Sequence, residues 1–264
     1  MNKIILNTIK NNQVAIPAKM LVLDMAGTTI NDNGIAFNTL YTTIKNYGLE
    51  IQKNELNKWH GANKYDVLNH YLEKEKFSVI AASNLPIEYG IMNNKDHIKK
   101  ELQQQLYTNY NNNLKQAYLD PFLDPPIKLM DENIPTLFNK IRSNGIKIAL
   151  NTGYNKDIQQ ILIDKFNMTE FIDDYISSNE VISGRPQPYM INKLIERNNI
   201  YLSNSVYSST DVIKFGDSVN NILEGHNSRC YASVGVLSGL DDEETLNTAN
   251  PTHLIKSVMD IDVE

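Results

Sequence analysis

Three polar residues, Asp24, Thr152 and Asp217, each stand where a short apolar run gives way to a glycine-containing turn. Such a run, ended by a polar residue and a turn, is typical of a buried strand leaving a sheet. In an open parallel sheet, ligands bind beyond the carboxyl ends of the strands. We therefore expect these three side chains, which are far apart in the chain, to face one crevice.

The residue types at these positions indicate phosphoryl chemistry. Asp24 precedes the turn Met25–Thr29, whose backbone N–H groups suit a carboxylate nucleophile that forms an aspartyl-phosphate. Asp217 supplies a second carboxylate, and a Mg²⁺ ion bound between the two would relieve their repulsion. Thr152 offers a hydroxyl donor to a phosphoryl oxygen, and Arg185 offers a positive charge beside the transition state.

The elements that would position these residues alternate between strand and helix. Strands are predicted at 19–24, 146–151, 212–216 and 230–236, and helices before Gly145 and after Ser218. This alternation favours an α/β fold with a parallel sheet covered by helices on both faces.

A long stretch between the first two strands differs from the rest. It has helical periodicity at 40–47, 54–60, 64–72 and 95–110, without a convincing strand, and a proline-rich passage at 120–126 follows it. We expect residues 37–118 to form an all-helical inserted domain, and residues 1–36 and 119–264 to form the sheet domain.

The composition excludes several classes of protein. The chain has 264 residues, with 25 Lys and Arg against 31 Asp and Glu, and only one cysteine. Its net negative charge argues against a nucleic-acid partner, and the single cysteine, Cys230, forms no intrachain disulfide and is expected to be a small buried apolar residue. No signal-peptide core or membrane-spanning run is apparent. We expect a soluble cytoplasmic protein.

Four segments together resemble the motifs of the haloacid dehalogenase superfamily, and within it the phosphonoacetaldehyde hydrolase (phosphonatase) branch. In order they are Leu23–Thr29, Asn151–Tyr154, Ser183–Pro188 and Gly216–Asn221. The resemblance implies a Rossmann-like core with an inserted helical cap, Mg²⁺ as cofactor, Asp24 as nucleophile, a small phosphorylated or phosphonate substrate, and a dimer formed through the caps. It places the metal at Asp24, Ala26 and Asp217, with Asn221 beside the ligands. We expect substrate contacts at Thr28, Gly153, His60 and Tyr154.

The residue type at position 26, an alanine, indicates which kind of bond is cleaved. Most phosphatases of this superfamily carry an aspartate there, which protonates the leaving group, and losing such an acid typically costs ~10²- to 10⁴-fold in rate. Alanine suits a leaving group that needs no proton from that side. In the phosphonatase-type mechanism, a cap lysine forms a Schiff base with the substrate aldehyde, and the iminium accepts the electrons of the breaking P–C bond. Lys64 matches that lysine, and phosphonoacetaldehyde is the expected substrate.

Three positions depart from the phosphonatase pattern. His60 stands where that pattern has methionine, Val67 replaces its proton-transferring histidine, and Asn221 replaces an aspartate of the fourth motif. Two alternatives therefore stay open. One is a phosphomonoester hydrolase in which His60, the substrate or water replaces the missing acid. The other is a degenerate member that binds a phosphorylated ligand or a protein partner without turnover.

Overall fold

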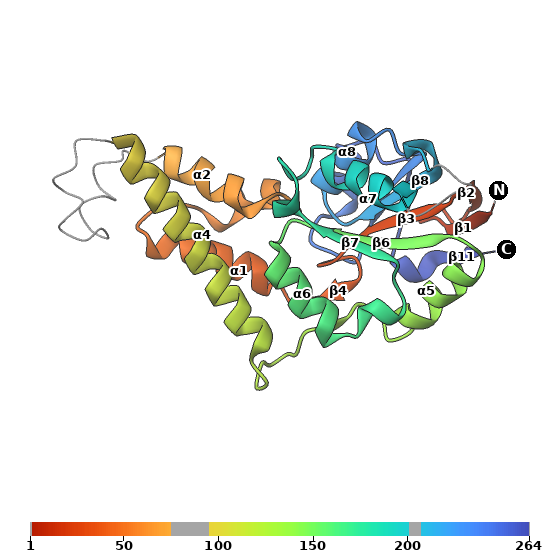
Figure 1. Cartoon of the computed structure of the whole chain (residues 1–264), viewed down its shortest axis with the longest axis horizontal. Helices are drawn as coiled ribbons and strands as arrows, with labels where there is room; N and C mark the ends of the chain where they lie inside the picture. The colour runs from red at the N-terminus through yellow and green to blue at the C-terminus, as the bar shows by residue number, and fades with distance from the viewer. Residues whose placement is uncertain (1, 75–94, 201–206, 264) are drawn as a thin grey trace.

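A computed structural model describes residues 2–74, 95–200 and 207–263 of the chain. Its centre is a six-stranded parallel sheet with the strand order β10-β9-β8-β3-β6-β7 (Figure 1). The strands span Met20–Asp24 (β3), Lys147–Thr152 (β6), Asp174–Ser177 (β7), Val212–Gly216 (β8), Ala232–Val236 (β9) and His253–Ile255 (β10). The α/β, Rossmann-like fold expected from the sequence is confirmed.

The central strand β3 is buried along its whole length, and apolar up to Asp24, because helices cover both faces of the sheet. Leu21 and Leu23 belong to the larger core cluster, to which helices α5 (Ile134–Ser143) and α6 (Lys156–Lys165) contribute. Met20 and Val22 belong to a second cluster with α7 (Tyr189–Ile200). Alternate residues of the strand thus pack against the helices on opposite faces of the sheet. Asp24 is therefore held at the end of a fully buried strand.

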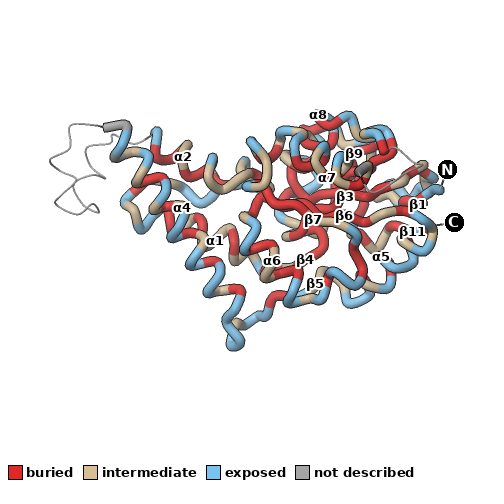
Figure 2. Tube along the Cα trace, viewed as in Figure 1, coloured by how far each residue is buried: buried red, intermediate tan, exposed pale blue. Residues whose placement is uncertain are grey.

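Helices α8 (Val219–Asn227) and α9 (Glu243–Asn247) complete the sheet domain. The Ser218 side chain caps α8 by accepting a hydrogen bond from the backbone N–H of Asn221. This cap begins the helix directly after Asp217, so the fourth motif is held between a strand end and a helix start. The buried residues in Figure 2 follow the strands of this sheet.

A smaller antiparallel sheet joins the two ends of the described chain. It has the order β11-β1-β2, with strands at Lys3–Asn7 (β1), Gln13–Pro17 (β2) and Ile261–Val263 (β11). Ile4 pairs with Val263. The sequence analysis did not predict this sheet, nor did it predict β7, and the strand predicted at 230–236 begins at Ala232.

A two-stranded ladder marks where the chain leaves the sheet and returns. Strand β4 (Ile30–Asn31) pairs with β5 (Lys128–Leu129), and between them lie α1 (Ile35–Asn46), a 3₁₀ helix η1 (Lys53–Trp59), α2 (Lys64–Lys74) and α4 (Lys95–Leu119). In Figure 1 these helices extend away from both termini.

The helices of this insertion are longer than the periodicity predicted, because α1 begins at Ile35 and α4 continues to Leu119. Residues 75–94 of the predicted insertion lie outside the described part. The division into a sheet domain and an inserted domain at residues 37–118 stays a prediction. Across the described ranges, no helix is long and apolar enough to cross a membrane.

Candidate active site

Asp24 lies at the carboxyl end of β3, where it is 4% exposed. Its Oδ1 atom accepts a hydrogen bond from the Met25 backbone N–H at 2.8 Å and lies 2.9 Å from an Arg185 guanidinium nitrogen. Its Oδ2 atom accepts from the Asn221 side chain at 3.0 Å. Burial alone would raise the pKa of Asp24, but the charges of Arg185 and Lys214 and these hydrogen bonds hold that pKa below its usual value. The carboxylate is therefore kept ionised, as a nucleophile must be.

Asp217 follows β8 and lies in a cradle made by two glycines. A Cβ atom built on Gly27 would come within 2.1 Å of Asp217 Oδ2, and one on Gly239 within 1.9 Å. Burial, followed by the negative charge of Asp24, raises the pKa of Asp217 to about 8. The two carboxylates thus repel each other in a tight, buried space, which is the electrostatic condition that a bound cation relieves.

The residues present fit Mg²⁺, which prefers one or two carboxylates completed by water and substrate oxygens. Asp24 and Asp217 would supply the carboxylates, and Ala26 has only its backbone carbonyl to offer. Asn221 adds no charge, although its buried Oδ1 atom has no hydrogen-bond partner among the described residues. Over that same part of the chain, no group of three or more His, Cys, Asp or Glu side chains could hold a metal.

Arg185 is completely buried and uses all of its nitrogens. Besides Asp24, it contacts Glu224 at 2.9 Å, the backbone oxygen of Asn151 at 2.7 Å and the Gly61 carbonyl at 3.3 Å. The arginine therefore ties the Asp24 carboxylate to strand β6, helix α8 and the loop before α2. It acts on Asp24 directly rather than as a solvated surface charge.

A second buried cation, Lys214, supports this network from the middle of β8. Its Nζ atom donates to Asn151 Oδ1 at 2.6 Å and lies 3.5 Å from Glu224. Burial, followed by the charge of Arg185, lowers the pKa of Lys214 to about 8. Sequence reasoning missed Asn151, Lys214 and Glu224 as members of the site, although a lysine inside an apolar strand is a signal of a buried ion pair.

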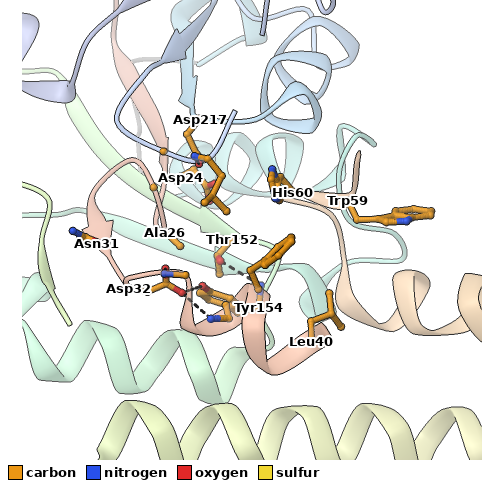
Figure 3. Close-up of a pocket in the computed structure, with 18 of the residues that line it drawn as sticks. Asp24, Ala26, Asn31, Asp32, Leu40, Trp59, His60, Thr152, Tyr154 and Asp217 are labelled. Atoms are coloured by element: carbon orange, nitrogen blue, oxygen red, sulfur yellow. Dashed lines mark hydrogen bonds between the residues drawn. The ribbon is translucent and has the colours of Figure 1, made fainter. Parts of the chain in front are cut away.

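A cavity of about 280 Å³ opens above Asp24 (Figure 3). Among its lining residues are those predicted at the site, namely Asp24, Ala26, His60, Lys64, Thr152, Gly153, Tyr154, Arg185 and Asp217. The structure thus brings the three strand ends and the arginine to one crevice. Phe37, Leu40, Leu56 and Trp59, all from the helical segment, add an apolar wall.

Thr28 and Asn221 are placed differently from the cavity residues. Thr28 is fully buried, and its hydroxyl donates to Asp217 Oδ1 at 3.4 Å. Asn221 is also fully buried, and its side chain donates to Asp24 Oδ2 at 3.0 Å. Neither is among the residues that line the cavity.

Lys64 is the first residue of α2 and is partly buried at the cavity wall. Its Nζ atom donates to the Ala62 carbonyl at 2.8 Å. Burial lowers the pKa of Lys64 to about 8, with Arg185 also lowering it, while the charges of Asp24, Asp32 and Asp217 oppose the shift. A substantial fraction of this amine is therefore neutral near physiological pH, which is what amine catalysis requires.

Tyr154 and Asp32 line another part of the cavity and are joined through the buried Tyr118; the sequence analysis identified Tyr154 but not Asp32 or Tyr118. Tyr154 and Tyr118 have their hydroxyl oxygens 2.9 Å apart, and Tyr118 donates to Asp32 Oδ2 at 3.0 Å. Asp32 also accepts from the Gly34 and Ala36 backbone N–H groups at 3.0 Å, so it caps the start of α1. Thr152 accepts from the Tyr154 backbone N–H at 3.3 Å (Figure 3).

His60 precedes Gly61 in the loop between η1 and α2. Its Nδ1 atom lies 2.6 Å from Asp241 Oδ1. Val67, by contrast, is completely buried in the main core cluster. Asp241 was missed because it stands in the acidic run Asp241–Glu244, which carries no sequence signal of a partner 181 positions earlier.

Comparison with known proteins agrees with this geometry. A family model described as haloacid dehalogenase-like hydrolase matches residues 21–234. A phosphonoacetaldehyde hydrolase of Bacillus mycoides (strain KBAB4) is 26% identical over 247 residues, covering 90% of this chain and 84% of the relative. A bifunctional phosphonoacetaldehyde hydrolase/aminoethylphosphonate transaminase of Clostridioides difficile (strain 630) is 26% identical over 226 residues, which are 84% of this chain and only 32% of that protein.

Among solved structures, a phosphonoacetaldehyde hydrolase-like protein from Oleispira antarctica superposes with a TM-score of 0.64. It is 23% identical, and the match covers 92% of this chain and 89% of the other. At that identity the similarity supports the fold. The family match, by contrast, spans most of the chain and contains the strand ends, the arginine and the helical segment described above. The chain belongs to the haloacid dehalogenase-like hydrolases and is similar to the phosphonoacetaldehyde hydrolases among them.

Proposed function

We propose that this protein is a Mg²⁺-dependent hydrolase that cleaves the P–C bond of phosphonoacetaldehyde or a similar aldehyde phosphonate. One observation carries the proposal. Lys64, an amine with a lowered pKa, lines the same cavity as the ionised Asp24 carboxylate, while position 26 has no side-chain acid. This combination suits a leaving group activated by an amine rather than by a neighbouring aspartic acid.

The residues divide the reaction between two sides of the cavity. Asp24 attacks phosphorus and forms the aspartyl-phosphate, while Arg185, 2.9 Å away, keeps the attacking carboxylate ionised and oriented. Thr152 and the turn after β3 bind phosphoryl oxygens. Mg²⁺, when bound by Asp24, Asp217 and the Ala26 carbonyl, would neutralise the charge that collects there.

Lys64 acts on the carbon side. Its neutral amine adds to the aldehyde, loss of water gives an iminium, and the electron pair of the breaking P–C bond enters that iminium as an enamine. Protonation of the enamine and hydrolysis by water return the free amine and release acetaldehyde. A second water molecule hydrolyses the aspartyl-phosphate. The apolar wall made by Phe37, Leu40 and Trp59 restricts water around the iminium.

The test is to incubate the protein with phosphonoacetaldehyde, Mg²⁺ and borohydride, and to map any reduced adduct by mass spectrometry. We expect an adduct on Lys64, together with release of phosphate and acetaldehyde when borohydride is omitted. Lys64→Ala should lose both, whereas Lys58→Ala, which removes an exposed lysine of η1, should keep both. Hydrolysis of simple phosphate esters that is insensitive to Lys64→Ala would instead identify a phosphomonoester hydrolase.

A further inference from the structure

We propose that His60 and Asp241 form a proton-transfer pair, in which His60 is the catalytic acid and base and Asp241 positions it. The inference rests on the proposed function and names the group that moves protons on the carbon side of the cavity. His60, in the loop before α2, would thus transfer the protons that Ala26 has no side-chain group to transfer.

The geometry of the pair is well defined. The His60 side chain is 10% exposed and that of Asp241 is 5% exposed, and Nδ1 lies 2.6 Å from Oδ1. The second oxygen of Asp241 accepts a hydrogen bond from the Val219 backbone N–H at 3.1 Å, at the first residue of α8. A carboxylate held on both oxygens directs the proton of a neutral imidazole to Nδ1. The lone pair is then on Nε2.

The Nε2 atom is buried and has no hydrogen-bond partner within the described ranges. A buried polar atom without a partner costs free energy, of the order of 1–3 kcal/mol. His60 lines the cavity that contains Asp24 and Lys64. A substrate or water held in that cavity would satisfy this nitrogen, so the unpaired atom itself points to a ligand.

Charged groups from several elements share the site with His60. Asp241, in the loop after β9, contacts the imidazole directly and interacts electrostatically with Asp217. The other charged side chains of the cavity are Asp24, Asp32, Lys64, Arg185 and Asp217. An imidazole that is paired with a carboxylate and lines the same cavity as an amine is suited to receive the lysine proton and return it later.

Other titratable groups of the cavity are already engaged. Asp24 and Asp217 belong to the phosphoryl side, and Asp32 accepts hydrogen bonds from two backbone N–H groups and from Tyr118. Burial raises the pKa of the Tyr154 hydroxyl well above 10, so it is a weak acid. Val67 lies in the core and has no acidic or basic group.

The proton balance follows directly. His60 Nε2 takes a proton from the Lys64 ammonium, and the neutral amine attacks the aldehyde carbon. The imidazolium then protonates the carbinolamine hydroxyl, which leaves as water and gives the iminium. After the P–C bond breaks and its electron pair forms the enamine, the neutral imidazole takes up a proton from solvent and passes it to the enamine carbon. Water hydrolyses the resulting iminium to acetaldehyde and the Lys64 ammonium, and hydrolysis of the aspartyl-phosphate by a second water returns one proton to solvent. No oxidant or reductant is consumed.

The test compares wild type, His60→Gln, His60→Ala and Asp241→Asn in two assays with phosphonoacetaldehyde. One assay measures the rate of borohydride-trapped adduct formation on Lys64, and the other measures the rate of phosphate release. We expect His60→Gln to slow both by ~10²- to 10⁴-fold, the range for loss of a positioned acid or base. Asp241→Asn should fall between it and wild type. Free imidazole should restore part of the rate of His60→Ala.

Asn220→Ala is the matched control for a purely structural role. The Asn220 side chain donates to the backbone carbonyls of His60, at 2.8 Å, and Lys58, at 3.3 Å, so it secures the same loop without touching the imidazole. We expect this variant to keep close to the wild-type rates in both assays. Loss in Asn220→Ala as large as that in His60→Gln, or no imidazole rescue, would overturn the pair as a proton-transfer device.

The two proposals fail in different ways. If wild type leaves phosphonoacetaldehyde intact but hydrolyses phosphate esters, the proposed function is wrong and the pair is tested on ethyl phosphate and 4-nitrophenyl phosphate. His60→Gln should then slow the alkyl ester, whose leaving oxygen needs a proton, far more than the nitrophenyl ester, which needs none. Equal losses on both esters would refute the pair, and a wild type inactive on all three compounds would refute both proposals.

Discussion

Asn221 donates a hydrogen bond to Oδ2 of Asp24 at 3.0 Å, and the same amide nitrogen contacts the Ser218 hydroxyl at 2.7 Å. The Asp24 carboxylate is therefore held by a neutral donor in the first turn of α8. Asn221 is completely buried. Replacing it with a charged residue would therefore change both the stability of the protein and the number of negative charges at the proposed metal site.

Asn221→Asp should destabilise the metal-free protein, because it replaces a donor to Asp24 with a third carboxylate beside Asp24 and Asp217. The loss in free energy of unfolding is expected to be about 1–3 kcal/mol, the cost of a lost partner for a buried polar group. Mg²⁺ should raise the melting temperature of this variant more than that of wild type. Equal metal-free stabilities of the two proteins in urea titrations would contradict this account.

Asp24→Asn should abolish phosphate release while leaving the fold intact. The amide keeps the shape of the side chain and can still contact Arg185 through its oxygen, but it is not a nucleophile. The measurements are phosphate release and far-ultraviolet circular dichroism. A near-normal rate in this variant would remove Asp24 from the role of nucleophile.

Arg185→Met should be strongly destabilising, because it leaves Asp24 and Glu224 as buried carboxylates without their shared partner. Removing one member of a buried ion pair typically costs about 3–5 kcal/mol. Arg197→Met is the control, since its side chain is 30% exposed and pairs with Asp174 and Glu180. That change should cost less than about 1 kcal/mol. Chemical denaturation of the two variants tests the contrast.

The amine of Lys64 should become reactive at a lower pH than the amines of surface lysines. Burial lowers its pKa to about 8, so the neutral amine forms as the pH rises through about 8. An ordinary lysine stays protonated until about pH 10.4. Labelling with an amine-reactive reagent, followed site by site by mass spectrometry, should therefore give a midpoint near 8 for Lys64. A midpoint equal to that of exposed Lys58 would contradict the lowered pKa.

Gly239→Ala should weaken Mg²⁺ binding, because its Cβ would come within 1.9 Å of Asp217 Oδ2 and must displace that carboxylate. Gly48→Ala is a matched control. A Cβ there meets nothing within 4 Å, although the backbone has a positive φ of 75°. The control should lose about 1–2 kcal/mol of stability from the left-handed backbone and keep its Mg²⁺ affinity, as measured by calorimetry.

Sequence reasoning selected residues that the structure brings to one cavity, because the polar residues that end the apolar runs stand at the carboxyl ends of parallel strands. Asp24, Thr152 and Asp217 end or directly follow strands β3, β6 and β8, and the parallel order of the sheet brings those ends together. Helix starts such as that of α8 were also visible, since a serine cap follows directly after the strand-end aspartate. These features are local, so composition and spacing reveal them.

The missed features depend on distant pairings. His60 and Asp241 are 181 positions apart, and neither lies in a pattern that selects the other. Lys214 appears in the sequence as a polar interruption of a strand. Only the fold shows that its ammonium pairs with Glu224 and donates a hydrogen bond to Asn151. Strand β1 has a partly exposed pattern, and its partner β11 lies at the other end of the described chain.

The pairing of β1 with β11 places the backbone of Ile4 directly across from that of Val263. This small sheet is separate from the six strands that carry Asp24 and Asp217. Dyes attached beside these two strands would report their separation by energy transfer, independently of the six-stranded sheet. Circular dichroism of the same labelled protein, which reports the secondary structure as a whole, would then show whether the small sheet separates before the rest of the fold unfolds.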